Sequence, residues 1–210
     1  MIAEPGCLIN PYTLKDDEYQ SHIEHTQLFT RILIEVLKNE YREIDDDFIA
    51  DIDTAAIMHD IGKRYIPESI VFKKGLLTQT EYEIIKTHTT KGHQHFQEMT
   101  QYVDTPRYQM IKDVILYHHE RWDGTGYPQQ KNGTEIPLAA RIVALADVFE
   151  ALISPRSYKS PFSFEKAKHI IIENSGSHFD PSIVSAFVKQ GKKFRALTFS
   201  LQVAFDEEVV

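Results

Sequence analysis

Apolar residues recur at helical spacing along most of this chain, and that spacing limits the fold more than any other feature. The first long example consists of Ile23, Leu28, Ile32, Leu33, Val36 and Leu37. Apolar side chains three and four positions apart lie on one face of a helix, where they can pack against a neighbouring helix. We therefore predict an all-α helical bundle, in which one helix runs from about Asp16 to about Glu40.

Local signals place the starts of further helices. The run Asp45–Asp47 begins a helix that continues toward His59. Thr78 and Glu81 form a capping-box pattern, which predicts one helix that carries His88. Asp180 followed by Pro181 marks another start.

Two more helices and a loop follow from composition. We predict a helix that carries Ile111, Val114, Ile115 and Leu116 and runs into His118 and His119, and another over residues 138–153 after Pro137. Residues 122–136 contain three glycines and Pro128, so we expect a loop there. Residues 197–205 alternate between polar and apolar, which is typical of a strand or a docked extension.

The 210 residues are enough for one domain with its own core. We predict an N-terminal extension over residues 1–15, a catalytic domain over 16–190 and a C-terminal tail over 191–210. The net charge of −8 argues against a broad DNA-binding surface, since such surfaces carry an excess of Lys and Arg. Neither a membrane-spanning segment nor a secretory signal is evident. A single cysteine, Cys7, suits a reducing compartment, and we expect a cytoplasmic protein.

Histidine and acidic residues form the candidate functional site. His59 and Asp60 follow an apolar helix, and such a pair taken alone is more often a surface feature. His88, His118 and His119 lie further along the chain, however, each at the end of or within a predicted helix. Together they offer nitrogen and oxygen ligands to a divalent ion.

A further carboxylate lies where burial would be costly. Asp147 interrupts the apolar run Ile142–Phe149, so it needs a cation or a hydrogen-bond donor nearby. A salt bridge would satisfy it, as would a metal. Glu18 and His22 share one helix face, which would be a solvated surface unless it joins the same site.

The motifs His59-Asp60-Ile61-Gly62-Lys63 and His118-His119-Glu120-Arg121-Trp122-Asp123-Gly124-Thr125-Gly126-Tyr127-Pro128 resemble those of the HD-GYP phosphodiesterases. These enzymes are a branch of the all-helical HD metallohydrolase superfamily. Eight of the eleven positions in the second motif match, and the likeness extends from about Glu18 to Val188.

The resemblance implies a metal centre in the bundle core and names its residues. The implied metal ligands are Glu18, His22, His59, Asp60, His88, His118, His119 and Asp147. Asp60 would bridge two ions, and Glu18 would support a third. Asp60 and Lys63 would take part in catalysis, whereas Tyr127, Arg156 and Lys159 would contact the substrate.

Two positions depart from the family pattern. Ser157 stands where proline is usual, and His25 stands where arginine is usual. Members commonly carry a regulatory domain before the catalytic part, and fewer than 20 residues precede Glu18 here. We therefore expect regulation through a protein partner, the tail or a homodimer. His25 and Glu120 are candidates for supporting the ligand histidines.

The resemblance implies hydrolysis of cyclic di-GMP, a signalling nucleotide, to pGpG, and it leaves open a further cleavage to GMP. Two ions would bind the phosphodiester and supply a bridging hydroxide that attacks phosphorus. Five neutral imidazoles and three carboxylates would leave the loaded pocket positive despite the acidic chain. Nitrogen and oxygen ligands without a thiolate suit iron or manganese, with nickel or zinc as alternatives.

Two other readings remain open. The substrate could be another cyclic dinucleotide, such as cyclic GMP-AMP, or a mononucleotide. Alternatively the chain could be a non-catalytic module that binds a cyclic dinucleotide or a protein. Loss of ligands would favour such a module, but every expected ligand position is filled.

Overall fold

The computed structural model describes residues 17–101, 103, 105–155 and 160–208, and within them the chain is helical. The α-helices are α1 (Asp17–Leu37), α2 (Asp46–Met58), α3 (Glu68–Val71), α4 (Gln79–Lys86), α5 (His88–Met99), α6 (Pro106–Tyr117), α7 (Leu138–Ile153), α8 (Phe164–Glu173), α9 (Pro181–Lys189) and α10 (Gly191–Glu208). Two short 3₁₀ helices, η1 (Ile61–Tyr65) and η2 (Gly133–Glu135), lie between them. The predicted all-α bundle is confirmed.

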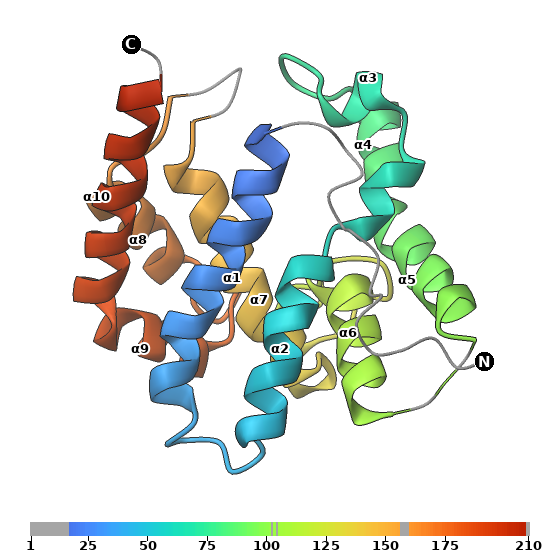
Figure 1. Ribbon diagram of the computed structural model, residues 1–210, viewed down its shortest axis with the longest axis horizontal. Coiled ribbons are helices and arrows are strands. Elements are labelled where there is room, and N and C mark those ends of the chain that lie inside the picture. The colour runs from blue at the N-terminus through green and yellow to red at the C-terminus, as the bar shows by residue number, and fades with distance from the viewer. Residues whose placement is uncertain (1–16, 102, 104, 156–159, 209–210) are drawn as a thin grey trace.

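Helices α1 and α7 cross the middle of the bundle, and the other helices pack around them (Figure 1). Helix α1 packs against α2 and α7, α2 packs against α6, and α5 packs against η1 and α6. Helices α8, α9 and α10 lie on the opposite side of α7 from α3, α4 and α5 (Figure 1). Phe29 of α1, Phe149 of α7, Phe187 of α9 and Phe194 of α10 are fully buried, and their rings pack together.

Helix starts follow the capping signals in the sequence. The side chain of Asp45 accepts a hydrogen bond from the backbone N–H of Phe48 at the start of α2. Thr78 and Glu81 form a complete capping box at the start of α4. Asp180 caps α9, whose first residue is Pro181. The same carboxylate pairs with Arg141 of α7 at 2.5 Å, so this cap also ties two helices together.

The chain turns where we predicted one continuous helix through His88. Helix α4 ends at Lys86 and α5 begins at His88, with Thr87 between them. The backbone N–H of Thr87 donates to the carbonyl of Ile84, three residues back, at 3.1 Å, and its hydroxyl donates to the same carbonyl at 2.7 Å. These short-range bonds replace the regular helical pattern. As a result His88 begins a new helix.

Residues 197–205 were predicted to form a strand or a docked extension, and the strand is wrong, because this segment belongs to α10. Phe194 and Thr198 are buried at a spacing of four residues, and Leu197 and Leu201 pack against the core. Helical burial therefore outweighs the short alternation. The loop predicted for residues 122–136 is confirmed, apart from the single turn η2. None of the helices in the described part of the chain has the length and apolar character needed to cross a bilayer.

Candidate metal centre

Three helix ends and two helix interiors bring the predicted ligand residues to one place. His59 and Asp60 follow the last residue of α2, His88 begins α5, and His118 and His119 follow α6. Asp147 lies within α7, and His22 lies on α1, which packs against α7. Residues separated by more than 100 positions therefore meet in the centre of the bundle.

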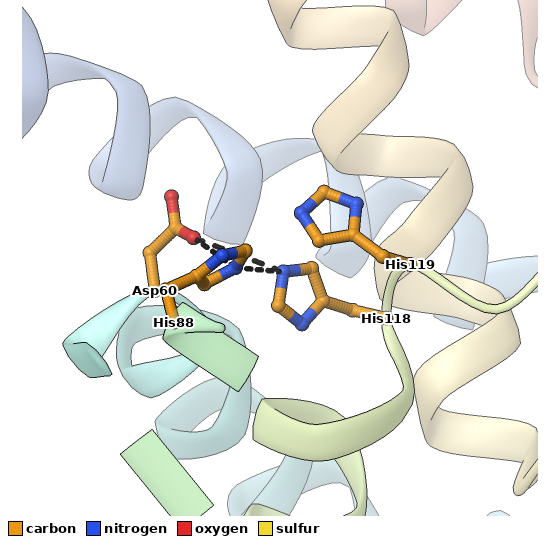
Figure 2. Close-up of side chains that lie close together, drawn as sticks. All are labelled: Asp60, His88, His118 and His119. Carbon is orange, nitrogen blue, oxygen red and sulfur yellow. Dashed lines mark hydrogen bonds and ion pairs between the residues drawn. The ribbon is translucent and has the colours of Figure 1, made fainter. Parts of the chain in front are cut away.

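The first donor group consists of Asp60, His88, His118 and His119, drawn in Figure 2. The Nε2 atom of His88 lies 3.2 Å from Asp60 Oδ1, and the Nε2 atom of His118 lies 3.7 Å from the same oxygen. The rings of His118 and His119 have centroids 4.1 Å apart. Each residue of the group offers an atom within 4.8 Å of the others, which is close enough to surround one ion.

The second donor group consists of His22, His59 and Asp147, all buried. Asp147 Oδ1 lies 3.3 Å from His22 Nε2 and 4.0 Å from His59 Nε2. The other oxygen of Asp60, Oδ2, lies 3.3 Å from His59 Nε2 and 3.7 Å from His22 Nε2. Asp60 therefore presents one oxygen to each donor group, as the predicted bridging role requires.

Hydrogen bonds at Nδ1 orient three of the histidine rings. Nδ1 of His59 lies 2.7 Å from the carbonyl oxygen of Ala56, and His88 and His118 make equivalent contacts with Ile85 and Val114 at 2.6 and 2.9 Å. A carbonyl oxygen only accepts, so each Nδ1 donates its proton. Each Nε2 then carries a lone pair that points toward Asp60, which is the tautomer that binds a metal.

The ionisation states of four donor residues, His118, His119, Asp60 and Asp147, suit cation binding. Burial lowers the pKa of His118, and burial together with His118 and His88 lowers the pKa of His119 well below its ordinary value, so both rings are neutral. Burial alone would raise the pKa of Asp60 and Asp147. The Lys63 ammonium and His59 nevertheless hold the pKa of Asp60 well below its usual range, and His22 does the same for Asp147.

Buried polar atoms without hydrogen-bond partners support a metal at this place. Within the described residues, His59 Nε2 and Asp60 Oδ1 are fully buried and make no hydrogen bond. Leaving such atoms unpaired is costly, and a divalent cation among them would remove the cost. The donors are imidazole nitrogens and carboxylate oxygens, so the site fits divalent transition metals better than Ca²⁺ or Mg²⁺.

Lys63 lies at the carboxylate of Asp60. Its Nζ forms an ion pair with Asp60 Oδ2, and it lies 5.7 Å from the ring centroid of Tyr19. The Tyr19 hydroxyl in turn donates to the backbone carbonyl of Asp60 at 3.0 Å. Gly62 allows this segment to pack closely, because a Cβ there would lie 1.8 Å from the carbonyl oxygen of His88.

Tyr127 covers the first donor group from the loop that follows His119. Its ring stacks on the His119 ring with centroids 4.9 Å apart and an angle of 30°. Lys86 Nζ lies 5.6 Å from the Tyr127 ring centroid and 5.5 Å from that of Tyr82. A cation and two aromatic rings therefore lie beside the first donor group, and only Tyr127 among them was predicted from the sequence.

Gly126 lets the loop fold back toward the histidines. A Cβ at this position would lie 2.4 Å from the backbone nitrogen of Arg121 and 2.6 Å from the carbonyl oxygen of His119. Glu120, predicted to orient a ligand histidine, instead accepts a hydrogen bond from the backbone N–H of Gln129 at 2.7 Å. It therefore holds the loop, and the prediction of its contact was wrong.

The remaining predicted residues fall outside what the structure describes. Arg156 and Lys159 lie in the undescribed segment 156–159, and the side chain of Glu18 is not described either. One buried residue was missed: Glu150 lies three positions after Asp147 on α7 and contacts His22. Its spacing from Asp147 places both on one helix face, which was the available signal.

Comparison with known proteins places these features in one family. The HD domain family model matches residues 12–183. A cyclic di-GMP phosphodiesterase of Vibrio cholerae is 43% identical over 187 residues, covering 87% of this chain and 38% of that protein. A 3'3'-cGAMP-specific phosphodiesterase of the same organism is 33% identical over 194 residues, covering 92% of this chain and 35% of that protein.

A solved structure shares the fold. The chain aligns with an HDG"Y"P protein from Bdellovibrio bacteriovorus at a TM-score of 0.57 and 20% identity. The match covers 83% of this chain and 52% of that one. The chain spans less than half the length of the two curated relatives.

Proposed function

This chain belongs to the HD domain family and, within it, to the HD-GYP phosphodiesterases, and from that premise we propose that it is a metal-dependent phosphodiesterase. We propose cyclic di-GMP as its substrate and the linear dinucleotide pGpG as its first product. Further cleavage to GMP would follow if pGpG binds at the same site. The catalytic domain would occupy residues 16–190, and a cytoplasmic location stays a prediction.

One observation supports this function most strongly: Asp60 presents its two oxygens to two separate donor groups. Bound there, a pair of divalent ions would neutralise the charge on a phosphodiester and lower the pKa of water so that a nucleophile forms at neutral pH. His59, His88 and His118 hold their Nε2 lone pairs toward this space without needing to move. The chain thus provides a preorganised site for an anionic substrate.

The residues around the donor groups can bind and orient the nucleotide. Lys63 carries a positive charge next to Asp60, where it can donate a hydrogen bond to a phosphate oxygen. We propose that Tyr127 contacts a guanine base or ribose, and that Lys86, at the end of α4, contributes to nucleotide binding. Arg156 and Lys159 remain proposed phosphate contacts on the strength of the motif alone.

We propose iron or manganese as the metal, with nickel and zinc as alternatives, because all donors are nitrogen or oxygen. Two ions match the two donor groups. A third ion would need the carboxylate of Glu18. Iron sites depend on redox state, so protein purified without oxygen is the right material for the test.

A second substrate deserves a place in that test. The relative from Vibrio cholerae that is 33% identical is named as specific for 3'3'-cGAMP. The metal chemistry would be the same for both nucleotides, and only the contacts to the second base would differ. A regulatory protein or a second copy of the chain remains a proposed partner.

The experiment is a substrate panel on the metal-loaded protein, with separation of the products by chromatography. We expect turnover of cyclic di-GMP to pGpG, and we expect Asp60→Ala to abolish it because both donor groups lose an oxygen. Preferred cleavage of cyclic GMP-AMP would correct the substrate and keep the reaction. Nucleotide that binds but returns unchanged with every metal would favour the non-catalytic module instead.

A further inference from the structure

We propose that Glu150 is a positioning residue that strengthens one of the two ion sites, the one formed by His22, His59 and Asp147. This inference rests on the metal binding in the proposed function, but it is independent of which nucleotide is hydrolysed. Nothing in the motifs of the chain assigns a role to Glu150.

The carboxylate of Glu150 is buried at the metal site. The residue is 1% exposed and lies on α7, three positions after Asp147. Its Oε2 atom accepts a hydrogen bond from Nδ1 of His22. Its Oε1 atom accepts one from the hydroxyl of Ser154, and His25 Nδ1 lies 3.6 Å away from the same oxygen. Both oxygens are therefore engaged, and the carboxylate is held in one orientation.

The contact at His22 differs from those at three other ligand histidines. Nδ1 of His59, His88 and His118 faces a backbone carbonyl, whereas Nδ1 of His22 faces a carboxylate. An ionised acceptor makes the stronger hydrogen bond and increases the electron density at the opposite nitrogen. Nε2 of His22, which points toward Asp147, is thus the donor that Glu150 makes more basic.

The effect should stay within one donor group. His22 belongs to the group with His59 and Asp147, and the group with Asp60, His88, His118 and His119 does not include it. The rings of His88 and His118 are held by the backbone carbonyls of Ile85 on α4 and Val114 on α6, not by α7. Changing Glu150 should therefore weaken one ion and leave the other unaffected.

The test is a titration of metal-free full-length chain with Mn²⁺ and Zn²⁺, followed by calorimetry and by elemental analysis after desalting. We expect two ions to bind the unaltered chain. In Glu150→Gln, we expect one ion to keep its affinity and the other to bind about 10- to 100-fold more weakly. Glu150→Asp keeps a carboxylate and should recover part of the loss.

Two variants serve as the negative and the positive control. Ser154→Ala removes the other hydrogen bond to Glu150 but keeps its contact with His22, so it should retain both ions. His22→Ala removes the ligand itself and should reproduce the loss seen in Glu150→Gln. If Glu150→Gln binds both ions as tightly as the unaltered chain, or loses both to the same extent, the proposal is overturned.

A second measurement on the unaltered chain covers the case in which Glu150→Gln does not fold. In ¹⁵N-histidine NMR spectra, His22 should carry its proton on Nδ1 and its Nε2 signal should shift when Zn²⁺ is added. A His22 ring that is protonated on Nε2 in the zinc-loaded protein would overturn the proposal. Failure of the chain to bind any ion would overturn this inference and the proposed function together, whereas a substrate other than cyclic di-GMP would leave the inference intact.

Discussion

The Nε2 atoms of His88 and His118 lie 3.4 Å apart, in the interior of the bundle. Both rings donate Nδ1 protons to backbone carbonyls, so two lone pairs face each other at this distance. That arrangement is unfavourable unless a proton or a cation lies between the two nitrogens. Asp60 Oδ1 lies 3.2 Å from Nε2 of His88. A single cation bound by His88, His118 and Asp60 would therefore remove the repulsion between the two lone pairs and balance the charge of the carboxylate.

Gly126→Ala should disturb the loop that carries Tyr127. The new Cβ would lie within 2.6 Å of backbone atoms of Glu120, Arg121 and His119, none of which can rotate away. We expect a loss of about 1–3 kcal/mol in the free energy of unfolding, together with a clear fall in nucleotide turnover. Denaturant melts and kinetic assays measure the two effects.

Gly191→Ala is the matched control for that variant, since a Cβ there meets no atom within 4 Å. It should change neither stability nor turnover. An equal effect of the two alanines would show that the close approach at Gly126 is unimportant.

Tyr127→Ala should raise the KM for the cyclic dinucleotide by about tenfold, the size expected when one stacking contact is lost. The ring stacks on His119 without being part of either donor group, so metal content should stay the same. Phe199→Ala, which removes an aromatic ring that is 70% exposed on α10, is the control. A fall in metal content in Tyr127→Ala would contradict a role limited to the substrate.

Arg141→Ala should destabilise the fold more than removal of an exposed ion pair. The side chains of Arg141 and Asp180 are 10% and 2% exposed, and they form an ion pair with Nη1 and Oδ2 2.5 Å apart. Loss of the arginine leaves a buried carboxylate without its cation, which costs about 3 kcal/mol of unfolding free energy. Arg31→Ala removes the exposed pair with Asp53 and should cost less than about 1 kcal/mol. Similar denaturation midpoints for the two variants would refute this difference.

The lowered pKa of His178 should make the stability of the fold depend on pH. Burial and the Arg121 guanidinium lower the pKa of His178 to about 4, against about 6.5 in an unfolded chain. As the pH falls from about 6.5 to about 4, the unfolded chain takes up this proton first, so the folded state loses stability. The contribution is at most about 1.4 kcal/mol per pH unit. Urea melts of His178→Gln should show a shallower dependence than the unaltered chain, and identical slopes would exclude the effect.

The sequence pointed to the residues that the structure gathers into the two donor groups because their physical signals are local. Asp147 lies in an apolar run, where an unpaired charge is costly, and the His59-Asp60 pair ends an apolar helix. The structure brings both together with His88 and His118. Glu18, Arg156 and Lys159 stay predictions, since the contacts of their side chains lie outside the described residues.

Features that depend on distant packing were harder to predict. Glu150 is a polar residue in a helix that would ordinarily face solvent, and only the position of α1 over α7 buries it against His22. The turn at Thr87 depends on a side-chain hydrogen bond to the carbonyl of Ile84, which no capping pattern in the sequence indicates. In α10, polar and apolar residues alternate over a short stretch, which favoured a strand in the sequence. Phe194 and Thr198 are nevertheless buried on one face of a helix.

The most direct test of the account is a crystal structure of the metal-loaded chain, with anomalous scattering recorded at the edge of the bound metal. The account predicts two peaks on either side of Asp60, one about 2.0–2.2 Å from Nε2 of His88 and His118 and one at that distance from donors of His22, His59 and Asp147. Peaks elsewhere on the molecule, or none when metal is present in excess, would contradict it.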